Sequence, residues 1–253
     1  MDVTFDPAWL QAYLLVLVRT TLFIAVAPPF SNNAFPWRIK ALVAAGLALA
    51  FTSRVEIPAG GLGAGQLIAA ATAEAATGAV LGVLVMVALA AVASAGSLID
   101  LASGFQMATA YDPGSMVNGA QFTRLFQNGA IALLLASGAH IPLFMGFGTS
   151  FEAVSLGQFP EMSSPAAAVA AAFTGMFAAA AQIAAPLIAV LFLADAGLGL
   201  LTRVAPTLNA FSLGFPLKIM VTLAFGGMVF AALPLAVGQL TDSAVELMRE
   251  GLR

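Results

Sequence analysis

The sequence predicts an all-α protein whose helices form polytopic, membrane-associated hairpins. Of the 253 residues, 61% are hydrophobic and 8% are charged, and the mean hydropathy is +1.00. A water-soluble domain of this size does not need so much apolar surface. The apolar residues also gather in six runs, which are separated by polar, turn-forming stretches. We therefore expect a membrane protein in which each run is helical.

Composition excludes several classes of function. The net charge is −3 and the basic residues are scattered, whereas a nucleic-acid surface needs clustered Lys and Arg. The chain has no Cys, which excludes disulfides, thiolate metal sites and Cys nucleophiles. Its one histidine, His140, is too few for a His-based zinc site. We expect no cofactor, no metal and no nucleic-acid partner.

The first apolar run has some features of a signal peptide, because the Ala-Val-Ala at residues 25–27 imitates a cleavage site. However, Asp2 and Asp6 stand where a signal peptide carries Lys or Arg, and Arg19 lies inside the run. We interpret this run as a retained first membrane segment.

The apolar runs differ widely in length. In chain order they cover residues 9–28, 39–53, 67–101, 125–147, 166–201 and 215–240. Only the first, at about 20 residues or ~30 Å of helix, is an ordinary span, although the fourth and sixth come close to that length. The second is too short, and the third and fifth would each rise more than ~50 Å. Such mismatch is tolerable if much of the apolar surface faces protein partners, or if the long runs bend at internal glycines and at Pro186.

Small residues in the long runs favour close helix packing. Gly78 and Gly82 form a GxxxG pair, Gly96 follows in the same run, and residues 166–185 are mostly alanine. Such faces let two helices approach closely, most often within one chain. We find no internal repeat, which argues against a secondary transporter, because those proteins are commonly built from related halves.

A few charged residues lie inside or at the edge of the apolar runs: Arg19, Glu74, Asp100, Arg124 and Asp195. An unpaired ion in lipid costs at least about 2.5–3.5 kcal/mol, so these side chains should face the protein interior, a neighbouring subunit or water. They either pair structurally or form a proton or ion relay. We favour structural pairing, because no series of His or carboxylate residues accompanies them.

Basic residues orient the runs. Residues 30–38, the central loop and residues 202–212 lie in the connections that carry most of the Lys and Arg, so we expect them on the cytoplasmic side, with both termini outside. Residues 241–253 place apolar and charged side chains at helical spacing. They predict a short amphipathic helix on a surface.

The longest polar interruption runs from residue 104 to residue 124. Pro113 has no N–H and disfavours helix at the residue before it, so helix should end near Gln106 and resume near Gln121. Bulky side chains stand in this otherwise polar loop, namely Met107, Tyr111 and Met116. The residues alone leave two interpretations open, a solvated turn and a gate, since long loops in compact proteins are often functional.

Enzyme motifs are almost absent. Leu-Ala-Ser-Gly occurs at residues 101–104 and 135–138, and His140 lies three residues after Ser137. A nucleophilic serine needs a hydrogen-bonded base, an orienting group and an oxyanion hole, and nothing in this spacing supplies that hole. A serine in an apolar helix more often bonds to its own backbone. We therefore expect no enzymatic activity.

Four stretches, which span nearly the whole chain in order, carry a family resemblance. They are APPFSNNAFPWRIKALVAAGLAL from Ala27, GFQMATAYDPGSMVNG from Gly104, LLLASGAHIPLFMGFGTSFEAVSLG from Leu133, and APLIAVLFLADAGLGLLTRVAPTLNAFSLGFPLKIMV from Ala185. They resemble the FliR family, the export-gate subunit of the bacterial flagellar type III secretion apparatus, whose injectisome counterpart is SctT. The pattern departs at residues 96–104, where the family usually has Gly-Glu and then Gly-Leu-Gln-Met-Gly. That departure leaves open whether Asp100 replaces the absent glutamate.

The resemblance implies a non-enzymatic channel subunit. One such chain would assemble with FliP and FliQ subunits into a helical gate for unfolded flagellar proteins, in contact with FlhB, FlhA and membrane lipid. The gate would lie in the bacterial inner membrane at the flagellar basal body. The resemblance also implies a FliP-like part at residues 1–165, a FliQ-like helical hairpin at 166–240 and an amphipathic tail at 241–253.

By the same resemblance, the central loop at residues 104–121 plugs the channel. The implied plug and its turn comprise Phe105, Gln106, Met107, Tyr111, Asp112, Pro113, Gly114 and Met116. The implied cytoplasmic hairpin tip, which faces FlhB, comprises Arg203, Pro206, Thr207, Asn209, Phe215, Pro216 and Lys218. The first alternative is a small-solute membrane permease, which would use the charges inside the apolar runs. The second is a structural membrane scaffold.

Overall fold

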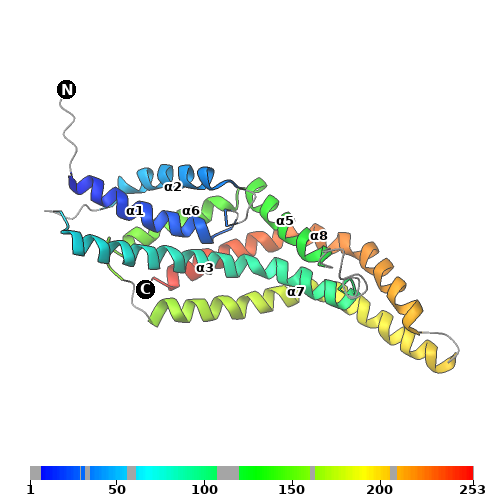
Figure 1. Ribbon diagram of the computed structural model, residues 1–253. Coiled ribbons are helices and arrows are strands. Elements are labelled where there is room, and N and C mark those ends of the chain that lie inside the picture. Colours follow the sequence, from blue (N-terminus) through cyan, green and yellow to red (C-terminus); the bar gives the residue numbers. More distant parts are fainter. Residues whose placement is uncertain are drawn as a thin grey trace. The chain divides into compact units, whose positions relative to one another are not determined.

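The computed structural model describes residues 7–28, 30–31, 35–55, 61–106, 120–159, 163–205 and 210–252. Over these residues the protein consists of helices and connections, without a strand (Figure 1). The helices are α1 (Pro7–Val26), α2 (Trp37–Thr52), α3 (Ala64–Ser103), α5 (Gln121–Ala136), α6 (His140–Ala153), α7 (Ser163–Val204) and α8 (Ala210–Glu250). The prediction of an all-α fold is confirmed.

Four helices within the described chain are long and apolar enough to cross a membrane, namely α1, α3, α7 and α8. The helices α3, α7 and α8 contain 40, 42 and 41 residues. At about 1.5 Å per residue each is roughly 60 Å long, about twice the thickness of a hydrocarbon core. The internal prolines do not interrupt them, since Pro186 lies inside α7 and Pro216 and Pro234 lie inside α8.

The fourth apolar run differs from its prediction as a single near-spanning segment. It is divided into α5 and α6, which are bent by 75° at a short break and count as a possible fifth span only when taken together. Gly138, in this break, has φ +76°, a left-handed conformation that glycine adopts without steric cost. The bend therefore has a local cause, which mean hydropathy does not detect.

The last helix extends further than expected. Residues 241–250 continue α8 instead of forming a separate short helix. Leu240, Ala244 and Met248, which define the apolar face, are only 8%, 0% and 0% exposed. A Cβ atom added to Gly146 of α6 would lie 3.0 Å from Cε of Met248. This face is therefore buried in unit 1, with Met248 against α6, whereas the charged side chains on the other face are exposed.

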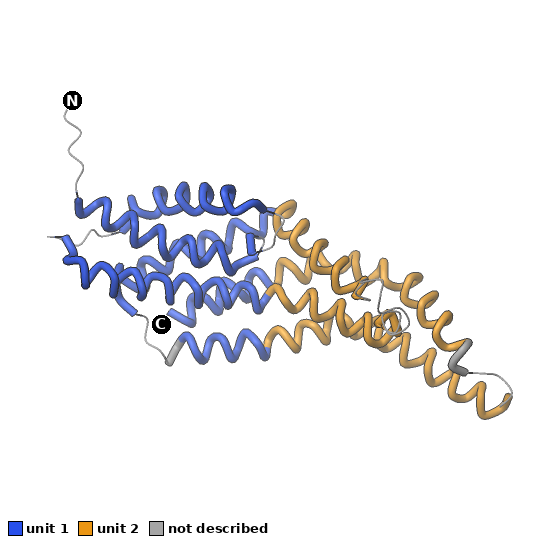
Figure 2. Tube along the Cα trace, in the orientation of Figure 1, with its two compact units in different colours: residues 1–88, 138–174, 240–253 blue, residues 89–137, 175–239 orange. Residues whose placement is uncertain are grey.

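The helices group into two compact units (Figure 2). Unit 1 comprises Met1–Ala88, Gly138–Thr174 and Leu240–Arg253, and unit 2 comprises Leu89–Ser137 and Gly175–Gln239. The three long helices contribute to both units. The expected FliP-like and FliQ-like parts, which meet at residue 166, are defined by resemblance and not by contacts, so that division stays a prediction.

Unit 1 is held by close backbone packing and by aromatic contacts. A Cβ atom on Gly78 of α3 would overlap the carbonyl oxygen of Arg19 on α1, and one on Gly82 would lie 2.8 Å from Cβ of Val26. The Phe23 and Phe147 rings stack with centroids 4.4 Å apart. The GxxxG pair thus serves helix packing within the chain, as predicted.

Candidate functional site

The central loop begins and ends close to the predicted residues. Helix α3 ends at Ser103, the described chain continues to Gln106, and α5 begins at Gln121. Several implied plug residues lie outside the described residues, namely Met107, Tyr111, Asp112, Pro113, Gly114 and Met116. The structure therefore defines the two ends of the loop, which we call the loop root (residues 96–106 and 120–126).

Asp100 joins the two sides of the loop root, both of which belong to unit 2. Its side chain is fully buried. Oδ1 accepts the Phe122 N–H at 2.9 Å, and Oδ2 accepts the N–H and the hydroxyl of Thr123 at 2.9 and 2.8 Å. These N–H groups belong to the first turn of α5, where a helix offers them no internal acceptor. A carboxylate of α3 thus caps α5, in the place where a helix favours negative charge.

Gly96 gives the first turn of α5 room to reach Asp100. It lies one helical turn before Asp100, so both residues are on the same face of α3. A Cβ atom added to Gly96 would lie 2.7 Å from the carbonyl oxygen of Phe122 and from Cα of Thr123. From the sequence, Gly96 was one of the internal glycines at which the long run was expected to bend, whereas the structure places the backbone of α5 against it.

Aromatic rings continue the loop root into α8. The Phe105 and Phe122 ring centroids are 5.8 Å apart, those of Phe122 and Phe126 are 6.0 Å apart, and those of Phe126 and Phe230 are 6.3 Å apart. Phe105 is half-buried and the next residue, Gln106, is exposed. Phe105, the first implied plug residue, is therefore packed against Phe122 within the loop root.

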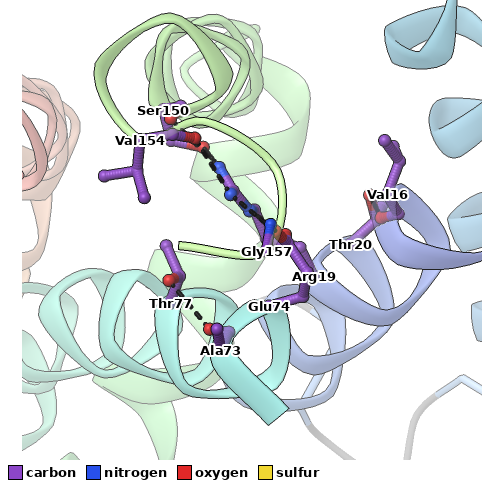
Figure 3. A network of polar contacts seen from close by, with 9 residues as sticks. All are labelled: Val16, Arg19, Thr20, Ala73, Glu74, Thr77, Ser150, Val154 and Gly157. Atoms are coloured by element: carbon purple, nitrogen blue, oxygen red, sulfur yellow. Dashed lines mark hydrogen bonds and ion pairs between the residues drawn. The ribbon is translucent and has the colours of Figure 1, made fainter. Parts of the chain in front are cut away.

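Arg19 and Glu74 form a second polar cluster, which lies in unit 1 (Figure 3). Arg19 Nε donates to Glu74 Oε2 at 2.5 Å, and Nη2 donates to Oε1 at 3.1 Å. The same guanidinium donates to the carbonyl oxygens of Ser150 and Val154 at 3.0 and 3.1 Å. Since α6 ends at Ala153, the cation lies at the C-terminal end of that helix, where the helix dipole favours positive charge. The Ser150 carbonyl oxygen also accepts the N–H of Val154 at 3.0 Å, so Arg19 shares this acceptor.

The carboxylate of Glu74 has one further partner, because its Oε1 accepts the N–H of Gly157 at 2.7 Å. The Arg19 guanidinium also lies 4.4 Å from the ring centroid of Phe151. The pair thus fastens α1 and α3 to the end of α6 and to the turn that follows. This geometry agrees with structural pairing, the interpretation favoured from the sequence, and it engages the charges that a relay would need free.

The remaining charges are more exposed. Asp195 of α7 and Lys218 of α8 form an ion pair at 2.8 Å, with side chains 50% and 23% exposed. Arg124 and Arg203 are exposed. Of the implied hairpin tip, Phe215 is half-buried and Pro216 is exposed, and three residues lie outside the described chain, namely Pro206, Thr207 and Asn209.

Ser137, the serine considered as a nucleophile, donates its hydroxyl proton to the carbonyl oxygen of Leu133 at 2.6 Å. This is the bond to its own helix that the sequence analysis expected of a packing serine.

Comparison with known proteins decides the family. Residues 10–244 match the family described as bacterial export proteins, family 1. The chain belongs to this family. Over 241 residues it is 32% identical to the flagellar biosynthetic protein FliR of Bacillus subtilis, covering 94% of this chain and 93% of that protein. It is 33% identical to FliR of Escherichia coli over 230 residues, covering 89% and 85% of the two chains.

The chain also matches a relative that is named for translocation and not for the flagellum. The chain is 31% identical to Yop proteins translocation protein T of Yersinia pestis over 137 residues, about half of either protein (51% and 50%). The flagellar relatives thus match over a much larger share of the chain. Together with the long apolar helices, the family identifies a membrane component of the flagellar type III export apparatus.

Proposed function

We propose that this chain is the FliR-like subunit of a flagellar protein export gate in the bacterial inner membrane, at the flagellar basal body. It assembles there with FliP-like and FliQ-like subunits, and its central loop seals the channel when no substrate passes. The observation that carries the proposal is the match to FliR of Bacillus subtilis over 94% of the chain. The loop root supports the sealing role, and the exposed apolar surface of the long helices supports assembly with other subunits.

The sealing role is supported by the chemistry of the loop. A channel that passes unfolded polypeptide is wide enough to leak ions when it is empty, so a closed state needs a removable seal. Met107, Tyr111 and Met116 are bulky, and methionine adapts to irregular surfaces, so these side chains can exclude water from a constriction and still yield to a passing chain. The ordered loop root supplies a fixed base from which the loop extends.

Assembly with other subunits is supported by the exposed apolar surface of unit 2. Large side chains of α7 and α8 that are more than 60% exposed include Phe177, Phe192, Leu193, Leu200, Met220, Leu223, Met228 and Leu235. Large exposed apolar surfaces mark membrane or protein interfaces. Because helices of roughly 60 Å exceed the hydrocarbon core, part of this surface must be covered by protein and not by lipid. We propose FliP-like and FliQ-like subunits as that cover, with FlhB and FlhA as further contacts on the cytoplasmic side.

Purification tests the proposed assembly against the small-solute permease. The full chain is expressed either alone or together with the FliP-like and FliQ-like proteins of the same bacterium, and is extracted in mild detergent. We expect one complex of fixed composition from co-expression, and aggregation or degradation of the chain when it is expressed alone. A monodisperse, heat-stable chain that ignores its co-expressed partners would favour the permease.

A further inference from the structure

We propose that Asp100 is a positioning residue for the seal. Its carboxylate clamps the first turn of α5 to the last turns of α3, and it thereby fixes both ends of the central loop. This inference rests on the proposed sealing function of that loop. It goes further because it assigns the control of the seal to a buried residue outside the loop.

The clamp is carried by three hydrogen bonds that one fully buried carboxylate accepts, from the Phe122 N–H and from the N–H and hydroxyl of Thr123. The capped helix has no cap of its own, because Ala120 at its N-cap position makes no side-chain hydrogen bond. Among the described residues, Asp100 is the acceptor of the Phe122 and Thr123 N–H groups. Without it the buried Phe122 N–H and the part-buried Thr123 N–H would lose this acceptor, and a shift of α5 away from α3 would let water reach them.

Close packing at Gly96 fixes the position of α5 along α3. Gly96 receives the backbone of Phe122 and Thr123 one turn before Asp100, so an α5 displaced along α3 would lose the hydrogen bonds and meet a side chain in place of the glycine. The Phe105 ring, which packs against Phe122, adds an apolar contact on the loop side of the clamp. Both ends of the loop are thus held at a defined separation.

The ionised carboxylate is the specific requirement. An asparagine at position 100 has nearly the same shape, but its NH₂ group is a donor and would face one of the donors that the second carboxylate oxygen now accepts. Asp100→Asn therefore keeps the volume and breaks one side of the clamp. Thr123→Val is milder, because it removes only the hydroxyl bond and leaves both backbone bonds to Asp100 in place.

The test uses the full chain assembled with its partner subunits in inverted membrane vesicles, in which passive proton leakage and the amount of assembled complex are both measured. We expect Asp100→Asn to raise leakage about fivefold per assembled complex, the ratio equivalent to about 1 kcal/mol for loss of a helix cap. Thr123→Val should raise it less. The matched controls are Asp242→Asn, an exposed carboxylate, and Thr174→Val, an exposed threonine bonded to its own helix, and neither should change leakage.

A second background separates the clamp from the seal itself. In a chain that lacks residues 110–114, the seal is already gone, so Asp100→Asn should add no further leakage. If the deletion leaks and Asp100→Asn does not, the clamp is wrong and the seal stands. If Asp100→Asn adds the same leakage in the full chain and in the shortened chain, its effect does not depend on the loop. The proposal that Asp100 positions the seal is then also wrong. If the deletion itself does not leak, the sealing function fails first. Should Asp100→Asn prevent assembly, Thr123→Val decides by the same comparisons.

Discussion

Arg19 of α1 and Glu74 of α3 form a doubly hydrogen-bonded ion pair in which neither side chain is exposed to solvent. Breaking a buried pair on one side is costly, since the remaining charge has no compensation. Loss of either side chain here would remove more than the ion pair. Arg19 also donates to carbonyl oxygens at the end of α6, and Glu74 accepts an N–H of the following turn. The pair is therefore a structural lock of unit 1.

Our first prediction concerns this lock. Glu74→Gln should lower stability by about 3–5 kcal/mol, since it leaves the Arg19 cation buried without its counterion. The double variant Arg19→Met, Glu74→Gln should recover part of that loss, because the unpaired charge is removed. Thermal unfolding of the purified complex measures both. Arg38→Met, at an exposed arginine of α2, is the control and should have little effect. Equal stability of Glu74→Gln and the parent would show that the pair is dispensable.

A second prediction concerns the α1–α3 contact. Gly78→Ala should destabilise unit 1 by about 1–3 kcal/mol or more, since its methyl group would overlap the Arg19 carbonyl oxygen and force the helices apart. Gly46→Ala is the matched control, because α2 leaves open space around Gly46 and alanine is the better helix former there. The measurement is the amount of folded protein recovered from membranes for each variant. Equal amounts for Gly78→Ala and Gly46→Ala would contradict the close α1–α3 contact.

A third prediction places the hairpin tip between α7 and α8. The chain has no cysteine, so Asn209→Cys creates a unique labelling site. Because Arg203 and Lys218 flank the tip, we expect a membrane-impermeant thiol reagent to reach it only from the cytoplasmic side. A crosslinker at the same residue should capture an FlhB-like partner. Labelling from the periplasmic side alone would reverse the proposed orientation.

The fold follows largely from patterns that the sequence displays directly. Composition and apolar run length predict long helices. Pro113 and its neighbouring turn residues predict that helix ends near Gln106 and resumes near Gln121. The break between α5 and α6 is missed because its three residues, Ser137, Gly138 and Ala139, are small and uncharged and do not end the apolar run. A signal for it exists in Gly138, which permits the turn, followed by Pro142, which is tolerated in the first turn of a helix.

The site is less accessible from sequence because its partners are distant along the chain. The cost of a buried ion predicts that Arg19 needs a partner, but nothing local selects Glu74, which is 55 residues away. Likewise, Asp100 was identified as a charge that must be satisfied, whereas Thr123 and the backbone of Phe122 carry no pattern that marks them as its partners. Helix-to-helix capping of this kind depends on packing, which only the three-dimensional structure supplies.

The most direct test of the sealing loop is a leakage measurement on a shortened chain. Residues 110–114 are deleted, the complex is assembled in membrane vesicles, and passive leakage of protons and of a small solute is recorded together with complex yield and substrate export. The account predicts intact assembly with leakage well above that of the parent gate. A shortened gate that assembles, stays as tight as the parent and exports substrate at the same rate would contradict it, and the loop would then be only a connection between α3 and α5.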